Sequence, residues 1–187
     1  PAPATSGAGY TIALQPNVKI APSSPTSHTV YIVGQNQVQI KGLYVYPNTS
    51  TYYGVCVSDK SVAAYHGILT RGARMAVFVD GSSFKQVTTT SRLTIMDSMD
   101  GASGQNYATL GLTFSVVVKT TTEFGYFVGY HSLLWAAYSH VIKCPKGYYA
   151  YGMSFVFAPY SNVAGCTTAA SPANDVIGNA NSFMVRW

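Results

Sequence analysis

The 187-residue chain has little charge. Asp, Glu, Lys and Arg together make up 9% of it, against roughly 25% in an average soluble domain. Six residues are acidic and eleven are Lys or Arg, which gives a formal net charge of +5. Ion pairs are too few to cover a surface, so uncharged polar residues and tyrosine must cover most of it.

The scarcity of acids argues against hydrolysis and against a bound metal. Cleavage of a glycosidic bond normally needs two carboxylates that face it. Asp80 and Asp100 are each followed by glycine, and Asp-Gly pairs are typical of tight turns, so we interpret both as turn residues. No calcium-loop motif occurs. The sequence predicts no cofactor and no metal site.

Cysteine and histidine are also sparse, with three Cys and four His. Cys56 with His66, or Ser132 with His131, could be imagined as a nucleophile and its base. Neither pair stands in a G-x-S-x-G elbow, and the cysteines lack zinc-ligand spacing. We therefore predict that the chain has no catalytic residues and is not an enzyme.

Three residues are candidates for covalent modification. Cys144 and Cys166 flank a tyrosine-rich strand, so they would form a disulfide if the chain turns back after that strand. Two buried free thiols are the other interpretation, and the one that we favour. Asn48 begins an Asn-Thr-Ser sequon within a turn, which makes it a candidate glycosylation site.

Long apolar runs and basic clusters are absent too. No run approaches the roughly 18 apolar residues of a membrane helix, so we expect no membrane span. No five basic residues cluster together, so the chain has no strong nucleic-acid signal. The first residue is Pro1, and we expect a chain that was processed or excised from a longer one.

Apolar residues are plentiful, and they alternate with a period of two. Hydrophobic residues make up 48% of the chain, enough for a sizeable core. A period of two is typical of half-buried strands. The apolar stripes predict a core that contains Phe114, Val116, Val118, Phe155, Phe157, Phe183 and Val185.

The same stripes predict an all-β fold of about eleven short strands. We expect a single-domain antiparallel β-sandwich or jelly-roll-like barrel over residues 28–187, behind an extended N-terminal arm or linker at residues 1–27. At most one short helix is expected, at Leu133–Val141. Residues 158–181 are predicted to form a long loop, and we find no repeat of roughly 20–50 residues.

Tyrosine is the abundant recognition residue, with 15 Tyr against 8 Phe and 2 Trp. Its ring offers a flat apolar face and a hydroxyl at low entropy cost, and sugar rings stack well on such faces. Tyr44, Tyr46, Tyr52 and Tyr53 bracket a proline-containing loop. We predict these four as a ligand-binding cluster, and packing in the core or across strands is the alternative.

Low charge suits extended interfaces, where charged residues are depleted. We therefore predict a non-enzymatic virion structural or attachment protein, such as a capsid, spike or fibre-head domain, at the virion surface or outside the cell. It would act as a homo-oligomer that binds a host-surface glycan or protein receptor. A secreted, lectin-like carbohydrate-binding module is the alternative, and a small secreted hydrolase is the third interpretation.

Overall fold

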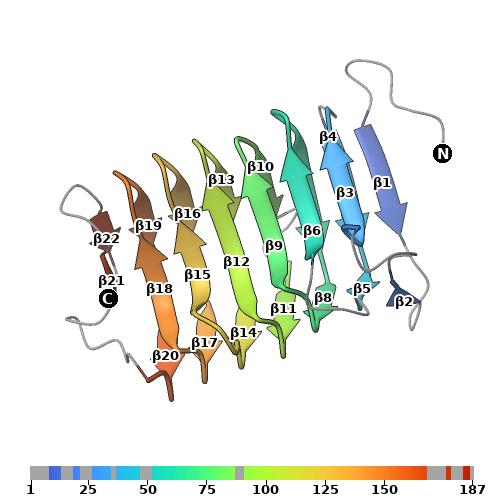
Figure 1. Ribbon diagram of the computed structural model, residues 1–187. Helices are drawn as coiled ribbons and strands as arrows, with labels where there is room; N and C mark the ends of the chain where they lie inside the picture. Colours follow the sequence, from blue (N-terminus) through green and yellow to red (C-terminus); the bar gives the residue numbers. More distant parts are fainter. Residues whose placement is uncertain are drawn as a thin grey trace.

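Every described strand pairs with neighbours that run in its own direction. The computed structural model describes residues 9–13, 19–21, 27–34, 37–46, 52–86, 91–167, 176–177 and 183–185. The strands form three parallel sheets, A, B and C, of eight, seven and seven strands. Figure 1 shows the strands of each sheet stacked side by side along one axis.

The strands are short, and within each sheet they lie side by side in the order in which they occur along the chain. Sheet A contains β1 (Gly9–Ala13), β4 (Gln37–Lys41), β7 (Val62–His66), β10 (Ser83–Gln86), β13 (Thr109–Gly111), β16 (Leu133–Trp135), β19 (Phe155–Phe157) and β22 (Phe183–Val185). Sheet B contains β2 (Lys19–Ile20), β5 (Tyr44–Val45), β8 (Ile68–Arg71), β11 (Leu93–Met96), β14 (Val116–Val118), β17 (His140–Ile142) and β20 (Asn162–Ala164). Sheet C contains β3 (Val30–Val33), β6 (Tyr53–Ser58), β9 (Met75–Asp80), β12 (Asp100–Gln105), β15 (Phe124–Val128), β18 (Lys146–Ala150) and β21 (Val176–Ile177).

The chain visits the sheets in the fixed order A, B, C and then returns to A one strand further along. Each turn therefore adds one strand to every sheet, which makes the molecule a three-sided β-solenoid. Equivalent positions recur every 21–26 residues, at Val62, Ser83, Thr109, Leu133 and Phe155.

These observations confirm the all-β prediction and correct its architecture. The antiparallel sandwich or jelly roll is wrong, because every strand pair in the described part of the chain is parallel and the strands form three sheets. The predicted absence of a repeat is wrong as well. The expected helix at Leu133–Val141 is replaced by β16 and β17, and no helix occurs among the described residues.

Strands also lie in segments that were expected to be arm or loop. β1 pairs with β4 and β2 with β5, so both strands extend sheets of the solenoid. β20 and β21 lie within residues 158–181. Asp80-Gly81 forms the expected turn, with a positive φ at Gly81. Asp100-Gly101 does not, since these two residues begin strand β12.

The core is built from columns of inward side chains, one residue per turn. Sheet A supplies Val38, Ala63, Phe84, Leu110, Leu134 and Val156. Sheet B supplies Val45, Thr70, Ile95, Val117, Val141 and Val163. Sheet C supplies Val55, Val77, Ala102, Tyr126 and Tyr148. The three columns meet in the interior and fill it.

The predicted core residues whose side chains the structure describes face outward. Phe114 and Phe155 are 38% and 37% exposed, while Val117 and Val156 are fully buried. Val116, Val118 and Phe157 are half-buried on the outer face. The side chains of Phe183 and Val185 lie outside the described residues. Because strand side chains alternate between faces, choosing the wrong starting residue inverts the whole stripe.

Adjacent valines in β14 test this assignment. Val117→Ala should lower the free energy of unfolding by about 2–3 kcal/mol, because two buried methyl groups are lost. Val116→Ala is the matched control, with the same change of residue in the same strand, and should cost less than about 1 kcal/mol. Urea denaturation of both variants measures the difference. Equal losses, or a larger loss for Val116→Ala, would show that the strand faces the other way.

Buried serines join successive turns at the corners between sheets. At the corner from C to A, the Ser132 hydroxyl donates to the carbonyl of Gly129 at 2.7 Å and accepts the amide of Ala108 at 3.0 Å. The Ser132 amide in turn donates to the Ser154 hydroxyl at 3.2 Å. These bonds satisfy corner backbone groups that no ladder reaches, and a buried group left unpaired would be costly.

A column of glycines lets successive strands of sheet C lie close to one another and to the inward side chains of sheet B. Gly54, Gly101, Gly125 and Gly147 occupy equivalent positions near the start of successive strands, with Ala76 between the first two. A Cβ atom built at Gly101 would overlap the carbonyl oxygen of Gly125. The close approach, rather than a positive φ, therefore requires glycine here.

Alanine substitutions along this column should be asymmetric. Gly101→Ala forces backbone to shift and should destabilise the fold by about 1–3 kcal/mol or more. Gly111→Ala is the control, because its nearest neighbour would be Lys85 Cα at 3.5 Å, an ordinary contact. Thermal denaturation of the two variants measures the effect. A Gly101→Ala protein as stable as the Gly111→Ala protein would contradict the packing described.

Tyrosine phenols lie inside the core as well as outside it. The Tyr65 hydroxyl lies 3.3 Å from Ser115 Oγ, and its ring stacks on Phe84 at 4.7 Å. Burial raises the pKa of Tyr65 and Tyr126 well above the ordinary value of a phenol. A group whose pKa is raised by folding stabilises the folded state below its unfolded pKa, and this contribution is lost as the pH rises further.

The solenoid should therefore lose stability above about pH 10, where phenols of an unfolded chain ionise. A spectrophotometric titration followed in parallel by circular dichroism checks this. We expect exposed tyrosines to ionise first and reversibly, and a second group to ionise only as the β signal disappears. A single reversible step with an unchanged dichroism spectrum would contradict the burial of these rings.

Candidate binding surfaces

The corners between sheets A and B project aromatic side chains outward. Three turns repeat one pattern, Leu-Thr-Phe-Ser, Ala-Ala-Tyr-Ser and Ala-Pro-Tyr-Ser, at residues 112–115, 136–139 and 158–161. The aromatic residue of each, Phe114, Tyr138 or Tyr160, has a positive φ between 54° and 56°. This left-handed conformation turns the chain sharply and leaves the ring exposed, while the following serine is drawn inward.

The three rings form a stack along the axis, which we call the aromatic ladder. Phe114 and Tyr138 lie 5.2 Å apart at 8°, and Tyr138 and Tyr160 lie 5.0 Å apart at 14°. Tyr138 therefore has a ring on each of its faces, and Phe114 and Tyr160 each have one face covered by Tyr138. A sugar that stacks on a free ring face would find that face occupied within the ladder.

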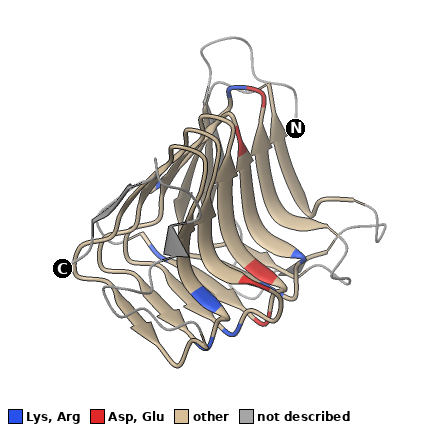
Figure 2. Ribbon diagram, turned by 60° about the vertical axis from the view of Figure 1, so that its left-hand side comes forward, with Lys and Arg blue, Asp and Glu red and all other residues tan. Residues whose placement is uncertain are grey.

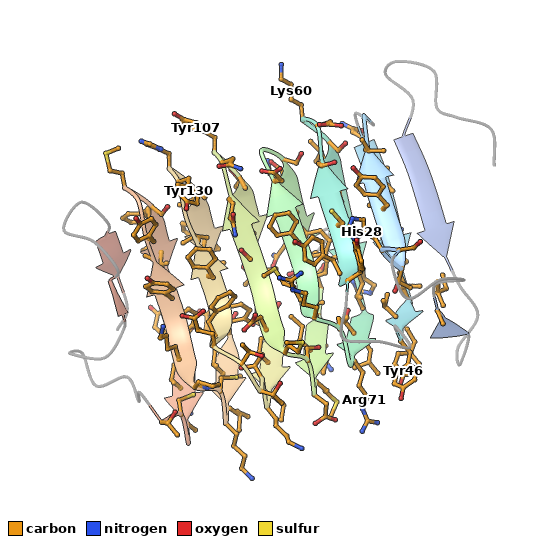
Figure 3. All side chains as sticks on the ribbon, viewed as in Figure 1. His28, Tyr46, Lys60, Arg71, Tyr107 and Tyr130 are labelled. Carbon is orange, nitrogen blue, oxygen red and sulfur yellow. The ribbon has the colours of Figure 1, made fainter. Side chains whose placement is uncertain are left out.

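The opposite corner, from C to A, carries a looser row of rings. Tyr107 is 73% exposed and stacks on His131 at 4.9 Å. Tyr130 meets Tyr151 edge-on at 5.7 Å. Figure 3 shows Tyr107 and Tyr130 on the same edge as Lys60. Sheet A is thus bordered by aromatic residues on both of its edges in the later turns.

The four predicted tyrosines fall into two groups. Tyr44 and Tyr46 both face outward at the end of sheet B, with their rings 6.1 Å apart and tilted by 57°. Tyr46 is 39% exposed, and Figure 3 places it near the edge where Arg71 lies. This pair is therefore not a face-to-face stack like those of the aromatic ladder.

Tyr52 and Tyr53 instead surround an imidazole. His28 stacks on Tyr53 at 5.0 Å and meets Tyr52 edge-on at 5.3 Å. Tyr31 lies 5.0 Å from the same imidazole. Burial lowers the pKa of His28, so its neutral form is favoured. Both Tyr52 and Tyr53 are half-buried, which matches the packing alternative for these two residues.

Charged residues gather at the turns rather than on the sheets. Figure 2 shows mostly uncharged ribbon, with charged positions concentrated where strands begin or end. Arg71 and Lys119 both contact the Asp97 carboxylate, at 3.0 and 3.5 Å, from the turns on either side. Lys146 pairs with Glu123 and lies 4.8 Å from the centre of the Tyr149 ring. These are exposed or half-exposed pairs and contribute little to stability.

Residues considered as nucleophiles have structural partners or lie apart. The Ser132 hydroxyl donates to the carbonyl of Gly129 and accepts the amide of Ala108, so it is used in the structure of the corner. Cys56 lies in sheet C and His66 in sheet A. Burial, reinforced by Asp80, raises the pKa of Cys56 to about 12. This thiol is therefore protonated at neutral pH and is a poor nucleophile.

Cys144 and Cys166 occupy equivalent inward positions at the corner from B to C. The Cys144 amide donates to Cys166 Sγ at 3.4 Å, and both are free thiols in this structure. Ser98 occupies the same place two turns before Cys144, and its hydroxyl donates to the carbonyl of Met96 in its own turn. The two thiols therefore act as corner residues, and their pairing in an oxidising environment stays a prediction. Asn48 lies outside the described residues.

Two shallow hollows lie on the surface of the solenoid. One, of about 290 Å³, lies on the outer face of sheet A, where Gln37, Gln39, Ala64 and Lys85 line it. The other, of about 420 Å³, lies at the corner of Asp59, Lys60, Asp80, Asn106 and Tyr107. Within the described ranges, no group of three or more His, Cys, Asp or Glu side chains is arranged to hold a metal ion.

Comparisons with known proteins identify no relative of this chain. No family model, curated protein or solved structure matches the chain. The described part of the chain also contains no helix of the length and apolarity needed to cross a membrane.

Proposed function

We propose that the chain is a non-enzymatic structural and attachment module of a spike or fibre, which acts at a virion surface or outside the cell. The main support is the solenoid itself. Stacked parallel turns form a rod whose outer faces are long, flat and nearly uncharged. Such a rod can carry binding residues at fixed intervals along its length.

The positions of polar groups favour binding over chemistry. Corner serines are used in hydrogen bonds between turns, as at Ser132, Ser139 and Ser161. The raised pKa of Cys56 makes it unreactive. Two of the acidic residues are engaged in pairs or backbone contacts: Asp97 pairs with Arg71, and Asp100 accepts the amide of Glu123 at 3.0 Å.

Tyr46 is the residue we propose for contact with a host-surface glycan or protein. Its ring is exposed, tilted against Tyr44 and next to a corner that carries Arg71. The aromatic ladder, whose ring faces cover one another, supports a structural role instead. This division argues for attachment by a small part of the surface and assembly by the rest, rather than for a dedicated lectin.

Binding measurements with single tyrosine variants test this proposal. Tyr46→Ala should lower binding to a printed array of bacterial and animal glycans, or to intact cells, by about tenfold or more if Tyr46 is an anchor. Tyr107→Ala is the matched control, because Tyr107 is more exposed but lies at the opposite corner.

The readouts are array fluorescence and flow cytometry, with thermal denaturation to show that both variants fold. Equal binding by wild type, Tyr46→Ala and Tyr107→Ala would refute the assigned contact. Absence of binding by wild type on both array and cells would refute attachment itself. A turnover activity of the wild type that is lost in the His→Ala variants would refute the non-enzymatic role.

A further inference from the structure

The outer face of sheet A changes character along the axis. In the early turns its outward residues are Gln37, Gln39, Val62, Ala64, Ser83 and Lys85. In the later turns they are Leu133, Trp135, Phe155 and Phe157. Trp135 and Phe157 lie on adjacent strands with ring centroids 4.2 Å apart. One sheet face is therefore polar at one end and aromatic at the other.

The aromatic end is bordered by apolar residues on both sides. The aromatic ladder runs along one edge, and Tyr130 and Met153, 48% and 51% exposed, lie on the other. We call this whole surface, from the ladder across β16 and β19 to Tyr130 and Met153, the apolar face. No Asp, Glu, Lys or Arg occurs within residues 130–138 or 151–160, which form its two central rows.

The apolar face is large for a monomer. Eight of its side chains are 37–60% exposed, which leaves roughly 700 Å² open if a large apolar side chain offers about 200 Å². The largest apolar patch on a typical monomer covers roughly 300–600 Å². A stable interface buries about 800 Å² on each partner. The area therefore matches what a specific protein contact needs.

We propose that the apolar face packs against the same face of a second copy of this chain. Parallel strands make the face flat, and its rows repeat at the strand spacing of about 4.8 Å, so two copies can interdigitate rows as packed sheets do. Contact of one face with itself is an isologous, two-fold arrangement and closes as a dimer.

The composition favours a second copy over a lipid surface. Aromatic residues and methionine are enriched, and Lys, Glu and Asp depleted, at the centre of protein interfaces. A surface that lies on a membrane instead combines its apolar side with Lys and Arg, and the two central rows of the apolar face contain neither. The inference rests on the proposed function in one respect, self-assembly, and names the surface that performs it.

Sedimentation velocity over about 5–200 µM protein tests the dimer. Wild type should have twice the monomer mass, and Trp135→Lys should weaken association at least tenfold. Gln39→Lys is the matched control: it occupies the position equivalent to Trp135 on the polar half of sheet A, adds the same charge and lies two strands away from Lys85. Lys85 stands naturally between them in this column, so a lysine there is compatible with the fold.

A second variant and a second measurement keep the test decisive. Leu133→Thr introduces the residue found at the equivalent position 109 and should also weaken the dimer, while circular dichroism reports folding. The proposed interface would be wrong if wild type is a monomer. It would also be wrong if Trp135→Lys and Leu133→Thr both remain dimers. If wild type is monomeric and sediments with phosphatidylcholine vesicles, and Trp135→Lys does not, the partner of the apolar face is a membrane and not a second copy.

The two proposals fail separately. If wild type is monomeric and still binds cells through Tyr46, the interface is wrong and attachment stands. If wild type is a dimer that Trp135→Lys dissociates, but binds neither glycans nor cells, attachment is wrong and the interface stands.

Discussion

Backbone hydrogen bonds between parallel, in-register turns are the constraint on which the rest of this molecule depends. They place each residue beside its equivalent in the next turn, at the strand spacing of about 4.8 Å. Core side chains then form columns, rings form stacks, and a corner serine in one turn accepts the amide of the turn before it. At Gly101 and Gly125 the same constraint leaves no room for a side chain.

In-register stacking also explains the low charge. A charged residue repeated in neighbouring turns would face its own kind across the ladder, and like charges that face each other across paired strands destabilise the pairing. The chain places many of its charges at corners, and at one of them Asp97 contacts both Arg71 and Lys119. Outer faces without charge follow from this, and where they are also aromatic they become surfaces that can join two copies.

The sequence predicts the strands of this fold better than their arrangement. Alternation with a period of two identifies a strand, but it carries no information on the direction of its neighbours. Residues 116–118 are Val-Val-Val, so the alternation there cannot say which face is buried. Phe155 was expected in the core because it continues an alternating stripe of large apolar residues, but the solenoid turns Phe155 outward and buries Val156.

A signal for the repeat does exist in the corners rather than in the strands. The Leu-Thr-Phe-Ser, Ala-Ala-Tyr-Ser and Ala-Pro-Tyr-Ser turns recur at intervals of 24 and 22 residues, counted between Phe114, Tyr138 and Tyr160. Changing turn lengths hide this periodicity from a search for a fixed spacing. The tyrosine-rich composition pointed to recognition, yet which rings stack on each other and which remain free depends on the corner geometry.

The register of the turns can be measured by pulsed electron paramagnetic resonance between spin labels at Lys60→Cys and Met153→Cys. Both residues precede a corner serine, and four steps along sheet A separate their turns. The native cysteines would be replaced by serine, and the labelled protein diluted with unlabelled protein. The solenoid predicts one narrow distribution centred near 19 Å, since each turn adds about 4.8 Å. A broad distribution, or one centred beyond about 30 Å, would contradict parallel in-register stacking.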